Sequence, residues 1–167
     1  MLTIDGKEVT YTPGQTVLES ARQAGIYIPT LCTVDGLPDA GACRLCLVQI
    51  EGMRGFPPAC TTPVADNMSV VTVSDELIRL RREILRLTLS EHPNSCITCK
   101  DNSLCEKYRQ CITKAGQVTG CNLCPSRESC DLRKVIEHVG LDNINIEFHY
   151  KELEVERDDP FFNRDYN

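Results

Sequence analysis

The stretch "CTVDGLPDAGACRLCLVQIEG", residues 32–52, and the nearby "PPAC", residues 57–60, set four cysteines in the pattern C-x10-C-x2-C-x13-C. They are Cys32, Cys43, Cys46 and Cys60. A 2Fe–2S cluster needs two outside thiolates on each iron, so its ligands must converge from several directions, as one C-x2-C pair with a cysteine on either side can do. The glycine in "DAGACRLC" lets the backbone approach the sulfides and point N–H groups at the negative cluster. The spacing therefore predicts a 2Fe–2S site.

Zinc is the alternative metal for these four thiols. Zinc ribbons usually combine two C-x2-C knuckles, whereas this part of the chain has one knuckle and two separate cysteines. The pattern favours the cluster over zinc.

The bulk composition narrows the class of protein. The cysteine count of 11 is odd, and the start "MLTIDGKEVTYTPG" has no basic segment followed by an apolar run, so a secreted disulfide framework is not expected. No run of residues approaches the roughly 18 apolar residues of a membrane helix. A net charge of −6 and the absence of tryptophan argue against nucleic-acid binding. We expect a cytoplasmic protein with no membrane span, or one on the cytoplasmic side of a membrane-associated complex.

The first 73 residues indicate a small α/β unit. Asp5-Gly6 between two β-prone segments predicts a hairpin. Thr16, with Glu19 three residues later, predicts a capping box, and Gly25 predicts the end of that helix. The segments "CLVQIEG" (46–52) and "MSVVTV" (68–73) are expected to be strands.

The segment "SDELIRLRREILRLTLS", residues 74–90, predicts a long amphipathic helix capped by Ser74 and ended by His92-Pro93. Its apolar face is expected to comprise Leu77, Leu80, Ile84 and Leu87, widened by Ile78, Leu85 and Leu89. We expect its arginines to form the solvated face, with a docking surface for a partner as the alternative; these are Arg79, Arg81, Arg82 and Arg86.

Residues 92–130 contain few apolar anchors, so bound metal is expected to hold them in place. Beyond them, a short helix is expected at residues 130–139 and a strand at 143–150, "NINIEFHY". We therefore divide the chain into residues 1–73, 74–140 and a C-terminal strand and tail at 141–167.

The first cysteine quartet departs from the C-x4-C-x2-C spacing of plant-type ferredoxins. It resembles the N-terminal region of the large iron–sulfur subunit of NADH:quinone oxidoreductase, a region also found in multimeric iron-only hydrogenases, NAD-linked formate dehydrogenases and electron-bifurcating complexes. This resemblance implies an α+β fold: a ferredoxin-like β-grasp 2Fe–2S domain, then a long helix and a small cluster-stabilised α/loop domain. It also implies that Cys32, Cys43, Cys46 and Cys60 are the 2Fe–2S ligands.

The same family has the motif H-x3-C-x2-C-x5-C after a long helix, and this chain matches it at His92, Cys96, Cys99 and Cys105. The resemblance implies a 4Fe–4S cluster with one imidazole ligand. A four-iron cube needs one ligand per iron, which three thiolates leave incomplete. The alternative is that His92 only caps the preceding helix and another group completes the site.

A second phrase repeats C-x2-C-x5-C at an offset of 25 residues. With the one remaining cysteine it makes a quartet: Cys111, Cys121, Cys124 and Cys130. A second 4Fe–4S cluster is the preferred interpretation, although the family pattern has no third quartet here. Zinc on the same residues, or Cys111 replacing His92 on the first cube, are the alternatives.

No dinucleotide fingerprint or phosphate loop is present, so nicotinamide and flavin are expected on a partner. The predicted function is a relay of single electrons between a flavin- and NAD(P)H-binding subunit, with its small 2Fe–2S companion, and a further redox subunit. The alternative is a zinc-stabilised interaction module without a redox role. The tail "DDPFFNRDYN" is similar to the family's lead-in to a further ferredoxin domain, so the chain is expected to be either a short subunit or part of a longer one.

Overall fold

A computed structural model describes residues 1–34, 36–90, 92, 103, 107, 124 and 126–141. The chain divides into two units, of which the first contains Met1–Leu85 and Asp131–Leu141 and the second contains Arg86–Cys130 and Asp142–Asn167. The expected strand at residues 143–150 lies outside the described residues. The sheet belongs to the first unit.

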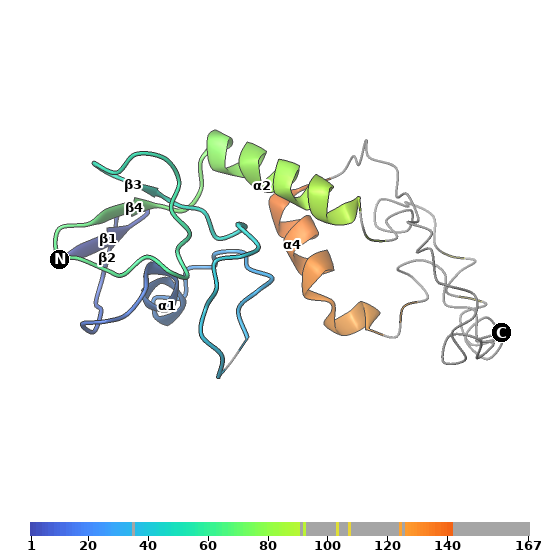
Figure 1. Cartoon of the computed structure of the whole chain (residues 1–167), viewed down its shortest axis with the longest axis horizontal. Coiled ribbons are helices and arrows are strands. Elements are labelled where there is room, and N and C mark those ends of the chain that lie inside the picture. Colours follow the sequence, from blue (N-terminus) through green and yellow to red (C-terminus); the bar gives the residue numbers. More distant parts are fainter. Residues whose placement is uncertain are drawn as a thin grey trace, which may run out of the picture. The chain divides into compact units, whose positions relative to one another are not determined.

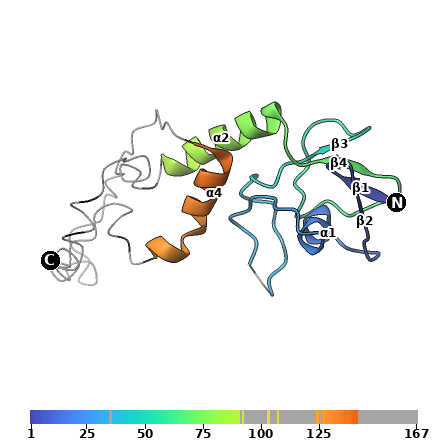
Figure 2. The same ribbon diagram turned by 180° about the vertical axis from the view of Figure 1, so that it is seen from behind.

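The described part of the first unit contains a mixed sheet of four short strands in the order β2-β1-β4-β3 (Figure 1 and Figure 2). The strands are β1 (Leu2–Ile4), β2 (Lys7–Val9), β3 (Gln49–Ile50) and β4 (Ser69–Val71). β1 is antiparallel to β2 and parallel to β4, and β3 is antiparallel to β4. The first and last strands in chain order, β1 and β4, thus pair in the middle of the sheet.

The turn between β1 and β2 confirms the hairpin predicted at Asp5-Gly6. Both residues have positive φ values, 51° and 77°, which is the conformation that a two-residue type I′ turn requires. Aspartate and glycine tolerate this region better than most residues do. The pairing of Leu2 with Val9 follows from that turn.

Helix α1 (Val17–Gln23) begins where the sequence predicts. The Thr16 hydroxyl accepts a hydrogen bond from the backbone N–H of Glu19 at 3.3 Å, and the Glu19 carboxylate accepts one from the Thr16 N–H at 2.7 Å. This reciprocal pair is the expected capping box. The helix contributes to a continuous buried cluster, which consists of Leu2, Ile4, Val9, Val17, Leu18, Ala21, Ile28, Cys46, Val48, Ile50, Ala59, Cys60 and Val70.

The strand predicted over residues 46–52 is shorter in the structure, where β3 contains only Gln49 and Ile50. The preceding residues are buried as expected, but they pair with residues 57–59 through an isolated bridge from Leu47 to Pro58. Two backbone bonds accompany it, from Val48 N–H to Pro57 O at 3.0 Å and from Ala59 N–H to Cys46 O at 2.9 Å. Proline has no N–H to donate, so a regular ladder cannot continue along this partner segment.

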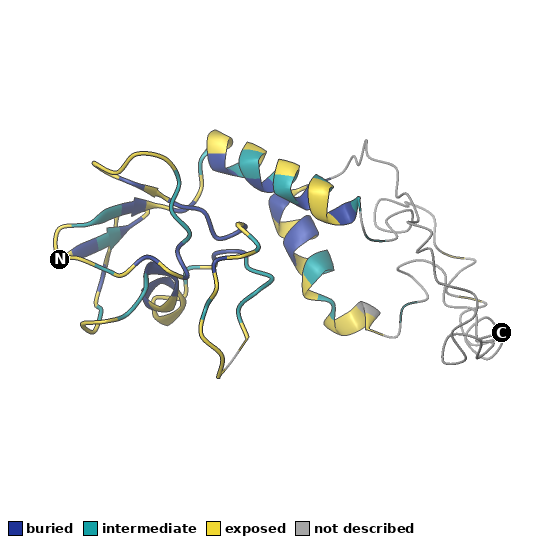
Figure 3. Ribbon diagram, viewed as in Figure 1, coloured by how far each residue is buried: buried dark blue, intermediate teal, exposed yellow. Residues whose placement is uncertain are grey.

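Helix α2 (Asp75–Leu89) begins after Ser74, whose hydroxyl accepts a bond from the Leu77 N–H at 3.3 Å, as predicted. Its fully buried residues recur every four positions, and they are Leu77, Arg81, Leu85 and Leu89 (Figure 3). Two expectations are therefore wrong. Leu87 is 67% exposed rather than on the apolar face, and Arg81 is only 2% exposed rather than solvated. The buried face follows the i, i+4 rows of the helix surface.

Helix α4 (Asp131–Val139) confirms the short helix expected at residues 130–139, and it belongs to the same unit as the sheet. It follows a 3-10 turn, η2 (Arg127–Ser129). The Arg82 Nε donates to the carbonyl of Val139 at 3.3 Å, which ties the end of α4 to α2. Among the described residues, no helix has both the length and the apolar character that a bilayer span demands.

Candidate metal centre

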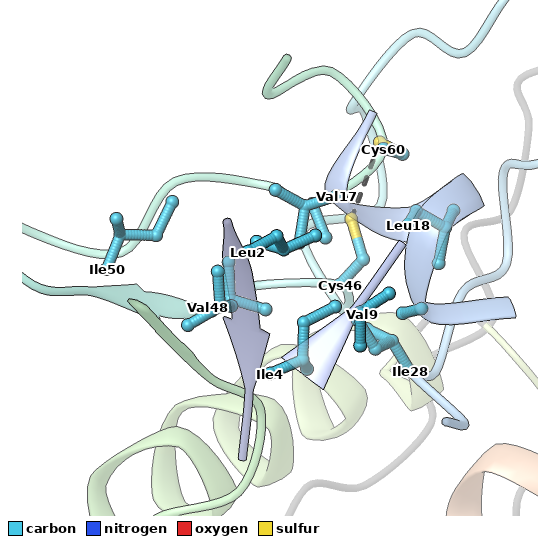
Figure 4. Packing of buried hydrophobic residues seen from close by; sticks show 13 residues of the cluster. Leu2, Ile4, Val9, Val17, Leu18, Ile28, Cys46, Val48, Ile50 and Cys60 are labelled. Atoms are coloured by element: carbon cyan, nitrogen blue, oxygen red, sulfur yellow. Dashed lines mark hydrogen bonds between the residues drawn. The ribbon is translucent and has the colours of Figure 1, made fainter. Parts of the chain in front are cut away.

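Cys46 and Cys60 lie side by side in the buried core, with 0% and 1% exposure, and their sulfurs are 3.4 Å apart (Figure 4). Two features of the backbone bring them together. The Ala59 N–H donates to the Cys46 carbonyl at 2.9 Å, and the neighbouring residues Leu47 and Pro58 form an antiparallel bridge. The local pairing of these two segments therefore sets the separation of the two thiols.

The segment around Cys60 is also held by the start of helix α1. The first helical N–H groups, which have no partner within a helix, donate outward. Val17 N–H bonds to Thr62 O at 2.9 Å and Leu18 N–H bonds to Ala59 O at 3.0 Å. Helix α1 contains no cysteine, but its N-terminus positions the residues that flank Cys60.

Cys32 and Cys43 form a second neighbouring pair, at the half-buried side of the site. The Cys43 backbone N–H donates to the Cys32 sulfur at 3.5 Å, and the Leu31 N–H donates to the Cys43 sulfur at 3.4 Å. Hydrogen bonds to sulfur stabilise negative charge on thiolates and on the clusters they bind. Each bond thus directs a backbone N–H at a predicted ligand sulfur.

The described residues of the loop from Cys32 to Cys46 include three with positive φ: Gly36 at 84°, Gly41 at 63° and Arg44 at 55°. A Cβ on Gly41 would lie 3.3 Å from Thr61 Cγ2, so glycine is needed there both for its backbone angle and for space. Arg44 lies between Cys43 and Cys46, where a left-handed residue is costly. Such conformations persist at ligand sites because the surrounding structure enforces them.

The donor set fits a binuclear iron–sulfur cluster. With metal–sulfur bonds of about 2.3 Å, two thiolates on one tetrahedral ion are roughly 3.8 Å apart, close to the 3.4 Å between the sulfurs of Cys46 and Cys60. Among the described residues, no three histidine, cysteine or acidic side chains are grouped as they would be around a single ion. A 2Fe–2S cluster requires two thiolates on each iron, and the contact of Cys46 with Cys60 provides one such pair.

Burial is the main cause that raises the pKa of Cys60 to about 12, and Cys46 and Asp39 act in the same direction. The thiol of the metal-free protein is therefore neutral at physiological pH. Metal ions bind the thiolate, so ligation at Cys60 must release a proton. This release makes metal loading depend on pH.

The other predicted ligands are only partly within the described residues. His92 follows α2, and its backbone N–H donates to Leu89 O at 3.2 Å. Cys130 lies between η2 and α4, and both Cys124 and Cys130 are half-buried. The remaining predicted ligands lie outside the described residues, and they are Cys96, Cys99, Cys105, Cys111 and Cys121. The two 4Fe–4S sites thus stay predictions.

Sequence reasoning missed Arg81 as part of this region. Its Nε donates to Leu45 O at 3.0 Å and its Nη2 donates to Leu47 O at 2.8 Å, so the guanidinium bridges the residues on either side of Cys46. The sequence does contain a signal that Arg81 is buried. Arg81 is four residues after Leu77 and four before Leu85, in the middle of a row of leucines on one helix face.

Comparison with known proteins identifies the class of this domain. Residues 1–75 match the family described as a 2Fe-2S iron-sulfur cluster binding domain. That range contains the sheet, helix α1 and all four cysteines of the first quartet. The similarity to that family is thus to the N-terminal part of the chain, residues 1–75 of 167.

Relatives confirm the resemblance to subunits of NAD(P)-linked complexes. The chain is 43% identical over 110 residues to the NADPH-Fe(3+) oxidoreductase subunit alpha of Geobacter sulfurreducens, which covers 66% of this chain and 13% of that protein. It is also 43% identical over 110 residues to the NADP-reducing hydrogenase subunit HndD of Solidesulfovibrio fructosivorans, covering 63% and 19%. With the mitochondrial NADH-ubiquinone oxidoreductase 78 kDa subunit of Candida albicans it shares 34% over 109 residues, covering 65% and 15%. The chain thus spans less than a fifth of the length of these relatives.

A solved structure extends the similarity along the chain. The crystal structure of an NAD+-reducing [NiFe]-hydrogenase in the H2-reduced state matches with a TM-score of 0.67 and 28% sequence identity. The match covers 91% of this chain and 53% of that one.

Proposed function

We propose that Cys32, Cys43, Cys46 and Cys60 bind one 2Fe–2S cluster, with Cys46 and Cys60 on the same iron. The observation that carries this proposal is the 3.4 Å separation of the two buried sulfurs. The family of residues 1–75 supports it. The fold that we propose for this domain is a β-grasp. The parallel pairing of β1 with β4 in the middle of the sheet supports it.

Such a cluster supplies reversible uptake of one electron at a time. The protein supplies its surroundings. The core excludes water from Cys46 and Cys60, while N–H groups of Leu31 and Cys43 donate to the two outer sulfurs. Burial and hydrogen bonds to sulfur are the main means by which a protein sets the potential of such a centre.

The wider role that we propose is an electron relay in a cytoplasmic oxidoreductase complex, a class that includes electron-bifurcating complexes. Electrons would pass between a flavin- and NAD(P)H-binding partner, with its small 2Fe–2S companion, and a further redox subunit. The names of the relatives support this role, since they describe subunits of NADPH-, NADP- and NADH-linked oxidoreductases and hydrogenases.

Two further clusters complete the proposed relay. His92 with Cys96, Cys99 and Cys105 would hold one 4Fe–4S cube. A second cube would be held by the remaining quartet, which consists of Cys111, Cys121, Cys124 and Cys130. The spacing of the cysteines supports both cubes, and the families of the relatives support the first one, at His92, Cys96, Cys99 and Cys105.

Iron analysis tests the proposal. The full chain, purified without oxygen, should be brown, bleach with dithionite, and contain about ten irons with matching acid-labile sulfide. Cys60→Ser should remove the 2Fe–2S signal from the electron paramagnetic resonance (EPR) spectrum, whereas the adjacent control Thr61→Ser should keep it. Zinc in place of iron, or a full 2Fe–2S signal in Cys60→Ser, would overturn the proposed function.

A further inference from the structure

Arg81 is the only charged side chain among the fully buried residues of the described part of α2. Arg81 is 2% exposed, and its guanidinium donates to two neutral acceptors, the carbonyls of Leu45 and Leu47. Those two residues immediately flank Cys46 in the C-x2-C segment. The long side chain therefore carries a positive charge from the helix into the region of the proposed ligands.

This buried charge has no carboxylate partner among the described residues. The ion pairs of the described part of the chain do not include Arg81. Asp5, the carboxylate whose charge acts on Arg81, directs both carboxylate oxygens at Thr72, at 2.7 and 2.6 Å. A buried ion without a counter-charge is expensive, and two carbonyl bonds offset only part of that cost.

The charges that act on Arg81 point to the missing partner. Burial lowers the pKa of Arg81, while negative charge at Cys46, and to a smaller degree at Asp5, raises it. A 2Fe–2S cluster held by four thiolates is anionic, and it becomes more negative by one charge when it accepts an electron. An anion at Cys46 would thus compensate the buried guanidinium.

We propose that Arg81 is the counter-cation of the 2Fe–2S centre and a positioning residue for its C-x2-C segment. It holds the carbonyls on both sides of Cys46, and its charge raises the reduction potential because it stabilises the reduced cluster more than the oxidised one. This inference rests on the proposed function of the four cysteines. The redox step is the addition of one electron from an external reductant, with no bond made or broken in the protein.

Three variants of the full chain separate charge from hydrogen bonding. Arg81→Gln keeps N–H donors but removes the charge, whereas Arg81→Lys keeps the charge but cannot reproduce the planar fork that bridges two carbonyls. Arg79→Gln is the control, because Arg79 lies on the same helix with a 72% exposed side chain. The readout is the midpoint potential of the 2Fe–2S EPR signal in a dithionite titration, recorded where faster-relaxing 4Fe–4S centres do not contribute.

The expected result is a lower midpoint potential in Arg81→Gln, with potentials close to the parent value in Arg81→Lys and Arg79→Gln. Equal potentials in Arg81→Gln and Arg79→Gln would overturn the inference, as would an Arg81→Lys potential as low as that of Arg81→Gln. If Arg81→Gln does not retain iron, the Arg81→Lys variant decides. It must keep the cluster, with a midpoint potential equal to that of the parent. Loss of the cluster from Arg81→Lys, or a lower midpoint potential in it, overturns the inference. A parent chain without any 2Fe–2S signal would instead overturn the proposed function, and the inference with it.

Discussion

The carboxylate of Asp5 accepts two hydrogen bonds from Thr72, one from its backbone N–H at 2.7 Å and one from its hydroxyl at 2.6 Å. Asp5 lies in the left-handed turn of the first hairpin, and Thr72 follows β4 just before helix α2. Thr72 is 1% exposed, so both of its donors need this partner. The contact ties the first turn of the chain to the entrance of the helix that contains Arg81.

We predict that Asp5→Ala lowers the free energy of unfolding by about 2–4 kcal/mol, since two charge-assisted bonds are lost and a buried N–H is left unpaired. Thr72→Val removes only the hydroxyl, and a double-mutant cycle should give a coupling of roughly 1–2 kcal/mol. The measurement is urea unfolding of the loaded chain. Asp5→Asn is the control, because asparagine also tolerates the left-handed turn. Additive effects of Asp5→Ala and Thr72→Val would contradict the coupling.

Gly41→Ala should destabilise the cluster loop more than Gly36→Ala does. Both glycines have positive φ, 63° and 84°, so both substitutions carry a backbone cost of about 1–2 kcal/mol. Only the new Cβ at position 41 meets neighbours, at 3.3 Å from Thr61 Cγ2 and 3.6 Å from Pro58 Cγ. We expect faster release of iron from Gly41→Ala to a chelator, followed by absorbance. Equal release rates in the two variants would show that crowding at Gly41 has no effect.

Thr16→Ala should lower stability by about 1 kcal/mol through loss of the capping box of α1. Because the first N–H groups of that helix donate to residues that flank Cys60, we also expect faster loss of the 2Fe–2S absorbance on heating. Thr16→Ser keeps the hydroxyl and serves as the control. If Thr16→Ala unfolds at a lower temperature than Thr16→Ser but retains iron for as long, the helix cap does not stabilise the metal site.

Cys124→Ser tests the quartet with no counterpart in the family pattern. We predict the loss of about four irons per chain, with the 2Fe–2S and the histidine-ligated 4Fe–4S signals retained, since each cube needs one ligand per iron. The measurement combines iron analysis with EPR of the reduced protein. Unchanged iron content would mean that this quartet is misassigned, and loss of zinc instead would assign it to a zinc site.

Short sequence motifs predict those elements that depend on interactions between neighbouring residues. The hairpin at Asp5-Gly6 and the cap at Thr16 are properties of a few neighbouring residues, and both are confirmed. The strand expected over residues 46–52 is shorter in the structure, since its ladder depends on a partner segment that contains Pro57 and Pro58. That partner is distant in the sequence, and periodicity within one segment carries no information about it.

The cysteine pattern predicts the family of the first domain, but it does not predict which cysteines contact each other. Spacing alone does not show that Cys46 faces Cys60 or that Cys32 neighbours Cys43, because these contacts depend on the fold of the loop. Helical periodicity places Arg81 in the same row as Leu77 and Leu85. It is expected on the solvated face only because a charged residue is rarely buried without a partner. The exception is informative, since the missing partner is the proposed cluster itself.

The first unit contains both Leu85 and Asp131, so the 45 residues from Arg86 to Cys130 leave it and return to it. Extending a segment tethered at both ends is inexpensive, because each doubling of its length costs only about 0.6 kcal/mol of chain entropy. Evolution can therefore lengthen, shorten or replace this insertion while the host domain keeps its architecture. The number of 4Fe–4S centres that we propose between α2 and α4 is in this sense a modular trait.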